Sequence, residues 1–301
     1  IILNQIPSST GYTSQYQNIG SIRNRGVEFV INSINIDSRD FRWTTDFNIS
    51  TNRNRLEKLT LQKVYYYALA SEAQNERVIR MEEGKPLSSF WGYKSLGVDP
   101  ETGNPLWYRD VLDENGKVTG REKTDSYSTA TQYLCGDPTP DLYGGFGTSF
   151  SWRGFDLSAS FTYSIGGLTY DGGYAGYMAP PGGTVGSNFH EDVLKAWTPE
   201  NRNSDVPRFV YQDQNINASS DRFLVPASYL NFQNAQIGYT IPSNVTSRIK
   251  VDRIRVYVAC DNIWYTSYRQ GLDPRGSFSG GTNYASNSPV RTITGGINLT
   301  F

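Results

Sequence analysis

Hydrophobic and polar residues alternate along several long segments of the chain. In residues 293–301 every second side chain is apolar or glycine, the last of them is an aromatic ring, and the residues between them are mostly threonine and asparagine. The same period of two holds over 41–50, 154–166 and 253–261. Because successive side chains of a β-strand point to opposite faces, these segments predict long strands with one apolar and one polar face.

Together with weaker patterns elsewhere, the alternation predicts about nine or ten antiparallel strands in sequence order. In the segment that ends at 241, the apolar phase slips near Asn234 and Ala235, which indicates a β-bulge. The strands are expected near 26–37, 41–53, 75–82, 87–98, 140–152, 154–166, 225–241, 251–263 and 289–301.

The predicted connections alternate between short and long. Two-faced strands with all long connections at one end are typical of outer-membrane barrels, in which the apolar face meets lipid and the polar face lines the lumen. In the longest connection, Asn188 and Glu191 fit a capping box and Pro199 ends the segment, so a short helix is expected there. Short turns are expected at 38–40, 83–86, 153 and 242–250, and long connections at 54–74, 99–139, 167–224 and 264–288.

Composition excludes several classes of function. A net charge of -1 over 301 residues gives no electrostatic basis for nucleic-acid binding. The two cysteines, Cys135 and Cys260, form no metal-binding motif, so neither a metal nor another cofactor is expected. His190 is the single histidine and no nucleophile motif accompanies it, so it is interpreted as a surface residue and the protein as not an enzyme.

Two glycine-containing stretches have simple structural interpretations. The segment 113–120 lacks the alternating ligands of a calcium loop, and a hairpin turn at Asn115 and Gly116 is favoured instead. The glycines of 141–150 have no lysine and helix after them, so they are interpreted as easing strand curvature rather than holding a phosphate. The chain begins without an initiator methionine or a signal peptide, so processing signals are expected upstream.

Several segments, taken together and in this order, resemble SusC-like TonB-dependent outer-membrane transporters, and they cover nearly the whole chain. The resemblance implies an all-β fold, a transmembrane antiparallel β-barrel of about 22 strands. Residues 1–301 would be its C-terminal part, with the plug domain and the N-terminal strands absent. A terminal aromatic such as Phe301 resembles the signal that outer-membrane assembly machinery reads. The segments are NIGSIRNRGVEFVI (18–31), GDPTPDLYGGFGTSFSWRGFDLSASFTYSIGG (136–167), VLKAWTPENRNSDVPRF (193–209), ASYLNFQNAQIGYTIP (227–242) and RIRVYVACDNIW (253–264).

The resemblance also implies a function and partners. It implies active import of a large nutrient across the outer membrane of a Gram-negative bacterium, with a SusD-like surface lipoprotein as partner and TonB acting through the absent N-terminal part. An oligosaccharide is the expected ligand, and a peptide importer of the same family is the alternative. From the residues alone, a small self-contained porin or adhesin barrel and a secreted glycan-binding β module stay open. An enzyme is not expected, because no catalytic constellation exists in the sequence.

Two sets of aromatic residues are candidate functional residues. Rings in the long outer connections can stack on sugars or contact peptide side chains. The alternative is that they pack the loops together or against the SusD-like lipoprotein. These candidate ligand contacts are Tyr170, Tyr174, Tyr177, Trp197, Trp264, Tyr265 and Tyr268. Rings near the short turns are expected to form one lipid-facing belt at the periplasmic interface. They are Phe41, Trp43, Trp152, Phe155, Tyr239 and Phe301.

Overall fold

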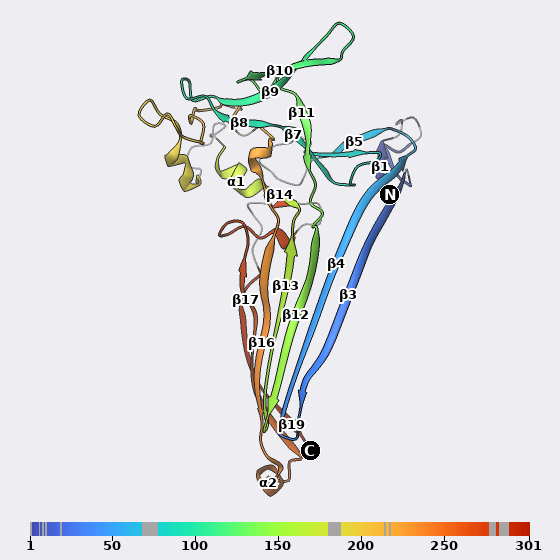
Figure 1. The fold of residues 1–301 in the computed structure, drawn as a ribbon, viewed down its shortest axis with the longest axis vertical. Helices are drawn as coiled ribbons and strands as arrows, with labels where there is room; N and C mark the ends of the chain where they lie inside the picture. Colours follow the sequence, from blue (N-terminus) through green and yellow to red (C-terminus); the bar gives the residue numbers. More distant parts are fainter. Residues whose placement is uncertain are drawn as a thin grey trace.

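The computed structural model describes residues 2–5, 7, 9, 11–18, 20–67, 78–179, 188–213, 215–216, 218–276, 281–282 and 289–301. The molecule has two parts, which Figure 1 shows one above the other. A long, narrow sheet of seven strands forms the lower part, which we call the wall. Shorter strands, short helices and loops form the upper part, which we call the outer layer.

The wall strands are antiparallel, and each pairs with its neighbours in sequence order. From one edge to the other they are β3 (Gly20–Asp37), β4 (Phe41–Leu59), β12 (Leu142–Trp152), β13 (Phe155–Ile165), β16 (Tyr229–Thr240), β17 (Arg253–Thr266) and β19 (Thr292–Thr300). Because β3 and β19 lie at opposite edges, the sheet is open. These two strands do not pair, so they do not close the small self-contained barrel that the residues alone left open.

Register divides the wall into two faces, because directly opposed residues of neighbouring strands point the same way. The ring centroids of Phe146 and Phe161 are 4.7 Å apart, and those of Phe161 and Phe232 are 4.4 Å apart. We call the side that carries these rings the apolar face and the other side the polar face. The alternation read from the sequence is therefore confirmed. One row of opposed rings crosses five strands of the apolar face: Phe47, Phe146, Phe161, Phe232 and Trp264.

The predicted bulge lies in β16. The pairing with β13 shifts where Ser160 lies opposite Asn234 and Phe161 lies opposite Phe232, so Gln233 is the extra residue. The neighbouring strand β17 is irregular at the same level, where Asn262 has a φ of 51°. A β-bulge inserts one residue and thereby reverses the facing of the residues beyond it. The slip in the sequence pattern near Asn234 is confirmed.

The number of wall strands was predicted wrongly. Seven strands form the wall among the described residues, rather than nine or ten. The strands expected near 75–82 and 87–98 belong to the outer layer, where they are β6 (Ile79–Glu82), β7 (Ser89–Tyr93) and β8 (Ser95–Val98), and the turn 83–86 joins two of them there. Four or five residues are too few to cross a membrane, which takes about 9–11 per strand. Alternation by itself does not distinguish the two kinds of strand.

All short connections of the wall lie at one end and all long ones at the other (Figure 1). The short ones are 38–40, 153–154 and 241–252, and the last contains α2 (Ser243–Thr246) and η4 (Ser247–Ile249). The long ones are 60–141, 166–228 and 267–291, of which 68–77, 180–187, 214, 217, 277–280 and 283–288 lie outside the described residues. The expected separation of short and long connections is confirmed, although two of the predicted long loops are parts of one excursion.

The outer layer consists of small sheets and single helical turns. The hairpin between β9 (Pro105–Leu112) and β10 (Val118–Thr124) turns at Asn115 and Gly116, with Gly116 at a φ of 77°, as the sequence predicts. No helix among the described residues is long and apolar enough to cross a membrane. The further elements are β1 (Ile2–Gln5), β2 (Ser14–Gln17), β5 (Val64–Tyr67), β9 (Pro105–Leu112), β10 (Val118–Thr124), β11 (Gln132–Gly136), β14 (Leu168–Asp171), α1 (Gly172–Tyr177), η2 (Glu191–Lys195), η3 (Asp221–Phe223), β15 (Leu224–Pro226), η5 (Pro274–Gly276) and β18 (Gly281–Thr282).

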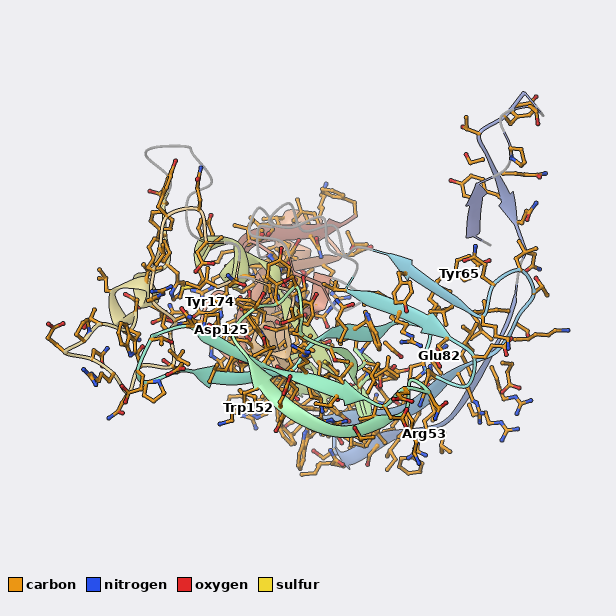
Figure 2. All side chains as sticks on the ribbon, turned by 90° about the horizontal axis from the view of Figure 1, so that it is seen from above. Arg53, Tyr65, Glu82, Asp125, Trp152 and Tyr174 are labelled. Carbon is orange, nitrogen blue, oxygen red and sulfur yellow. The ribbon has the colours of Figure 1, made fainter. Side chains whose placement is uncertain are left out.

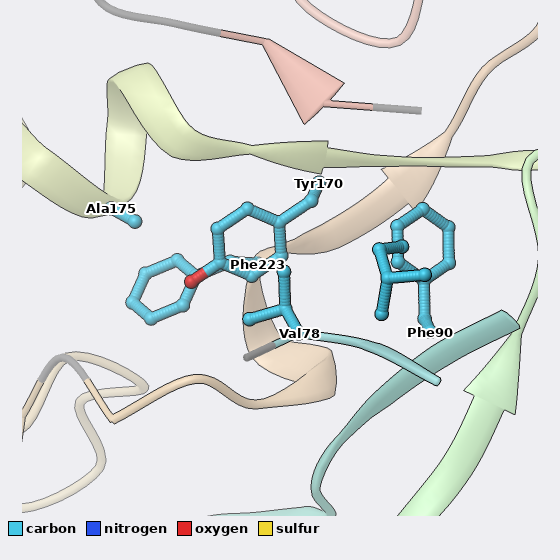
Figure 3. Packing of buried hydrophobic residues seen from close by; sticks show 6 residues of the cluster. Val78, Phe90, Tyr170, Ala175 and Phe223 are labelled. Atoms are coloured by element: carbon cyan, nitrogen blue, oxygen red, sulfur yellow. The ribbon is translucent and has the colours of Figure 1, made fainter. Parts of the chain in front are cut away.

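Two apolar clusters hold the outer layer together and fix it to the wall. In the larger one, Phe223 of η3 meets Tyr170 of β14, with their ring centroids 6.1 Å apart, and Phe90 of β7 lies beside them (Figure 3). The smaller one joins the upper end of β4 to β6, because Leu56 and Leu59 pack with Met81. Burying side chains of this size contributes roughly 1.5–3 kcal/mol each. The outer layer is thus seated on the part of β4 that extends beyond β12.

Gly144 leaves a gap in β12 that a tyrosine fills. The Tyr163 hydroxyl of β13 donates a hydrogen bond across β12 to the backbone oxygen of Asn48, at 3.0 Å. A Cβ at Gly144 would overlap that oxygen and would lie 2.9 Å from the hydroxyl. The glycine is therefore required for close approach, which is more specific than the strand curvature expected from the sequence.

We expect Gly144→Ala to destabilise the wall by about 1–3 kcal/mol, because the added methyl group displaces the Asn48 backbone or the Tyr163 hydroxyl. The folded fraction of the full-length receptor, measured by its heat-modifiable mobility in gels during thermal unfolding, checks this. Gly295→Ala is the matched control, since a Cβ there meets nothing closer than 4.0 Å. Equal stability of the two variants would contradict the proposed role of the gap.

Candidate ligand-binding site

A cleft of about 510 Å³ lies where the polar face of the wall meets the outer layer. Tyr143, Ser164 and Tyr229 come from the upper ends of three adjacent strands, each in the phase that points to the polar face. Asn52 and Asn54 of β4 continue the lining. Outer-layer residues close the cleft from above: Leu87, Ser88, Pro138, Thr139, Pro140, Leu168, Thr169, Ala227, Pro274 and Arg275.

Charge in the cleft is internally balanced. Arg275 donates from Nε to Asp273 Oδ1 at 2.8 Å and from Nη2 to Asp273 Oδ2 at 2.7 Å, in a two-pronged pair. Its guanidinium carbon also lies 4.6 Å from the ring centroid of Tyr265. Burial raises the pKa of Asp273, but the hydrogen bonds from Arg275 outweigh this and the net pKa is lowered. Since Asp273 is ionised and paired, the cleft offers amides, hydroxyls and rings rather than a free charge.

An ion pair with a buried carboxylate ties two long connections of the outer layer together. Asp171, at the end of β14, is almost fully buried and accepts from Nε of Arg269 at 2.7 Å. The same carboxylate caps α1 by accepting from the backbone nitrogen of Tyr174 at 3.0 Å. Arg269 also lies over the Tyr174 ring, 5.2 Å from its centroid. One carboxylate therefore orients a helix and fixes the connection 267–291 to the connection 166–228.

Tyr174 extends this network outward. Its hydroxyl donates to Asp192 Oδ2 at 3.0 Å, and Lys195 donates to the other carboxylate oxygen at 2.6 Å. Burial, together with the bond to Asp192, raises the pKa of Tyr174 to about 12, so the phenol stays a neutral donor. The bond from Lys195 holds the pKa of Asp192 below its usual value although burial raises it. Tyr174 thus joins α1 to η2.

The helix expected at 188–199 differs in type and in its cap. It is a 3₁₀ helix, η2, and His190 rather than Asn188 is its N-cap, with Nδ1 accepting from the backbone nitrogen of Asp192 at 3.2 Å. The His190 ring meets Tyr174 edge-on at 4.8 Å. The histidine is thus part of the loop packing. Among the described residues, no three His, Cys, Asp or Glu side chains are arranged to hold a metal.

The structure separates the seven predicted ligand contacts by role. Tyr170 is only 6% exposed and belongs to the apolar cluster of the outer layer, and Tyr174 is held in the loop network. Trp197 donates from its indole nitrogen to the Pro100 oxygen at 3.1 Å and covers Gly103.

The other four lie elsewhere. Trp264 lies on the apolar face, opposite Phe232, and so points away from the cleft. Tyr265 lies on the polar face beside Arg275, close to the cleft. Tyr177 and Tyr268 are exposed in the outer layer. Contact of these residues with a ligand stays a prediction, and Tyr265 is the one that the geometry brings nearest to the cleft.

Sequence reasoning missed Tyr143 and Tyr229, the two rings that line the cleft. Both occupy the polar phase of their strands at the end that joins a long connection. An aromatic ring in an otherwise polar phase next to a long loop was the available signal. The sequence-based prediction of ligand contacts covered the rings of the long connections alone.

Four of the six expected belt residues form one lateral row on the apolar face near the short turns. Phe41 lies opposite Trp152, Trp152 opposite Phe155, and Phe155 opposite Tyr239. Trp43 lies two residues further along β4 and stacks on Phe150 at 5.7 Å, and Phe301 directly follows β19. Whether these rings share one level in a membrane stays a prediction.

Comparison with known proteins gives consistent relatives. The sequence is 31% identical to the TonB-dependent receptor P3 of Formosa agariphila, over 98% of this chain and 30% of that receptor. It is 28% identical to the TonB-dependent receptor SusC of Bacteroides thetaiotaomicron, over 90% of this chain and 26% of that receptor. No family model matches the sequence. The chain belongs to the SusC-like TonB-dependent receptors.

A solved structure agrees with the SusC-like assignment. The fold is similar to that of the RagAB peptide transporter, with a TM-score of 0.78 and 28% sequence identity, over 99% of this chain and 31% of that one. The wall is accordingly part of a TonB-dependent transporter barrel. This chain spans less than a third of the length of the curated SusC-like relatives that it matches.

We expect Asp171→Ala to loosen the outer layer without unfolding the wall. The substitution removes the cap of α1 and the hydrogen bonds that Asp171 accepts from Arg269, whose side chain is itself 31% exposed, so it costs about 1–3 kcal/mol. Hydrogen exchange of the connections 166–228 and 267–291 should rise, while that of β12 and β13 stays slow. Asp40→Asn breaks the exposed pair with Arg153, at 3.3 Å, and should leave exchange unchanged. Unaltered exchange in the Asp171 variant would disprove the coupling.

Proposed function

We propose that this chain is the C-terminal part of a receptor that actively imports a large nutrient across the outer membrane of a Gram-negative bacterium. One observation carries the proposal: the seven neighbouring strands of the wall keep one apolar and one polar face while their long connections gather at one end. Inside a bilayer every backbone group needs a partner, so an open sheet with a lipid-facing side requires further strands. Those strands and a plug domain are proposed to come from polypeptide outside these 301 residues.

The proposed partners follow from the two ends of the wall. At the long-loop end, we propose contact with a SusD-like surface lipoprotein, centred on the segment 188–213. Leu194 there is 91% exposed, and Phe189 and Tyr211 are also exposed, which favours a docking surface. TonB would act through the absent N-terminal part. Since the relatives are receptors, we propose no catalytic role.

For the ligand, we propose an oligosaccharide, with a peptide as the alternative. The cleft presents side-chain amides, hydroxyls and two tyrosine rings, and the one cation among its described lining residues, Arg275, is neutralised by Asp273. Neutral polar groups and flat rings suit a sugar polymer, which carries hydroxyls and apolar ring faces. A peptide terminus would call for a free charge. The peptide alternative is supported by the similarity to the RagAB peptide transporter.

The full-length receptor, purified from outer membranes in mild detergent through a tag, tests the proposal. We expect a lipoprotein to co-purify, and mass spectrometry of the bound small molecules to identify glycans. Bound peptides would replace the oligosaccharide proposal by its alternative. Recovery of a receptor that needs no detergent would instead support a secreted glycan-binding module, and recovery without a lipoprotein would count against the pairing.

Truncation of the cleft tyrosines should weaken ligand binding. We expect Tyr143→Ala and Tyr229→Ala each to raise the Kd for the recovered ligand by about tenfold, as for a ring at the centre of an interface. Isothermal titration of the purified complex measures this. Tyr12→Ala removes an exposed ring outside the cleft and should bind as the native receptor does. If the cleft variants match this control, the ligand binds elsewhere.

The belt of rings at the short-turn end is expected to lie at the periplasmic membrane interface. Lipids brominated near the headgroup quench tryptophans at that depth. Trp152→Phe removes a quenched emitter, so the quenched fraction of fluorescence should fall in reconstituted receptor. Trp107→Phe removes a buried emitter of the outer layer, so the quenched fraction should rise. A rise with both variants would place Trp152 away from the interface.

A further inference from the structure

Four arginines oppose one another on the hairpin of β3 and β4. The register places Arg23 opposite Arg55 and Arg25 opposite Arg53. Like charges in directly opposed positions repel and destabilise a sheet. All four residues are exposed, and Figure 2, viewed from above, has Arg53 near the margin of the molecule. An anion bound between the two opposed arginine pairs would offset this repulsion.

These arginines continue the apolar face of the wall. Phe29 lies opposite Ile49, Val27 opposite Thr51, and the next two positions of the same phase are the opposed arginines. The other phase behaves differently over the same stretch. There Asn52 and Asn54 line the cleft, and Leu56 is buried beneath the outer layer. The four guanidinium groups therefore lie on the outward side, above the apolar rows.

Their level matches the upper boundary of a membrane. The eight residues from Phe41 to Ile49 span about 27 Å of strand, or about 21 Å of height at a tilt of about 40°. The twelve residues from Phe41 to Arg53 give about 31 Å of height by the same reckoning. The apolar band of an outer-membrane barrel is about 25 Å tall. Arg25 and Arg53 thus come directly after that band ends, at the depth of the outer headgroups.

The cluster has a surplus of positive charge. Arg23 is paired with Glu57 at 3.2 Å. Among the described residues, no carboxylate lies within ion-pair distance of Arg25, Arg53 or Arg55. Four guanidinium groups therefore face one carboxylate. The excess is what a bound anion with two or more charged groups would neutralise.

We propose that this cluster binds the phosphate groups of the anionic glycolipids that form the outer leaflet of the outer membrane. The inference rests on the proposed placement of the wall in that membrane. A guanidinium group donates two parallel hydrogen bonds to a phosphate, and a phosphate between opposed arginines turns their repulsion into two attractions. The acyl chains of the same lipid would lie along Val27, Phe29 and Ile49, which are continuous with the cluster on one face.

Native mass spectrometry of the full-length receptor tests the proposal with purified bisphosphorylated lipid A as the probe. The receptor is delipidated in detergent and titrated with the lipid. We expect the double variant Arg25→Gln and Arg53→Gln to bind the lipid about tenfold more weakly than the native receptor. The matched control, Arg39→Gln and Arg153→Gln, removes two arginines at the opposite end and should bind as the native receptor does. Dephosphorylated lipid A should bind all three proteins equally.

Two results would overturn the inference. Equal binding of bisphosphorylated lipid A by the double variant and the control would do so, with heat-modifiable mobility confirming that both are folded. Loss of the co-purifying lipoprotein with lipid binding unchanged would assign the cluster to a protein partner instead. Membrane fractionation separates this test from that of the function. A native receptor that is absent from the outer membrane would overturn both the proposed function and this inference. A receptor that is present there, but whose double variant and control bind bisphosphorylated lipid A equally, would overturn this inference alone.

Discussion

Register between neighbouring strands is the constraint on which the rest of the structure depends. Each wall strand carries apolar residues in one phase and polar residues in the other, so a slip of one residue would exchange the two faces. β13 shows how tightly this is fixed, because it pairs with β12 along its whole length and with β16 from Phe155 to Ser164. A slip there would place Ser160 among the rings of Phe146 and Phe232 and turn Phe161 to the polar side.

The irregularities of β16 and β17 preserve this register rather than weaken it. Both strands depart from regular pairing at the same level, at Gln233 and Asn262. Because each strand takes up additional length there, Phe232 and Trp264 are again opposed on the apolar face. The aromatic row therefore continues across five strands. Without the extra residue in β16, Gln233 would lie opposite Phe161 and Phe232 would turn to the polar face.

The sequence was sufficient to predict the regular features of the wall and insufficient for the outer layer. Alternation identified long strands such as β13 because one phase of each is uniformly apolar over eleven residues. It misassigned β6 and β7, in which Ile79 and Phe90 are buried by residues far away in the chain. Short strands of this kind are specified by tertiary packing, which leaves no periodic signal of its own.

The candidate site shows the same division. Tyr170 and Tyr174 were correctly placed in an outer connection, yet which ring would be buried depended on Phe223 and Arg269, more than 50 residues further along the chain. The cleft residues Tyr143 and Tyr229 were overlooked because a ring in a polar phase reads as an exception to the strand pattern. In a barrel wall, an aromatic ring in the polar phase at the end of a strand can line a cleft.

The hairpin of β3 and β4 contacts three environments along one pair of strands: the wall, the outer layer and the upper boundary. Its apolar phase ends at Ile49 and Thr51 and is continued by arginines, whereas its polar phase passes from the asparagines of the cleft to the buried Leu56. The period of two is unbroken along β4 up to the bulge at Glu57, so the backbone does not mark where the environment changes. The change of environment is visible instead in the residue types of one face, which pass from apolar side chains to arginines while the alternation continues. One long strand pair can therefore span the wall, support the outer layer and present charge at the upper boundary, with regular pairing between the bulges at Asn35 and Glu57.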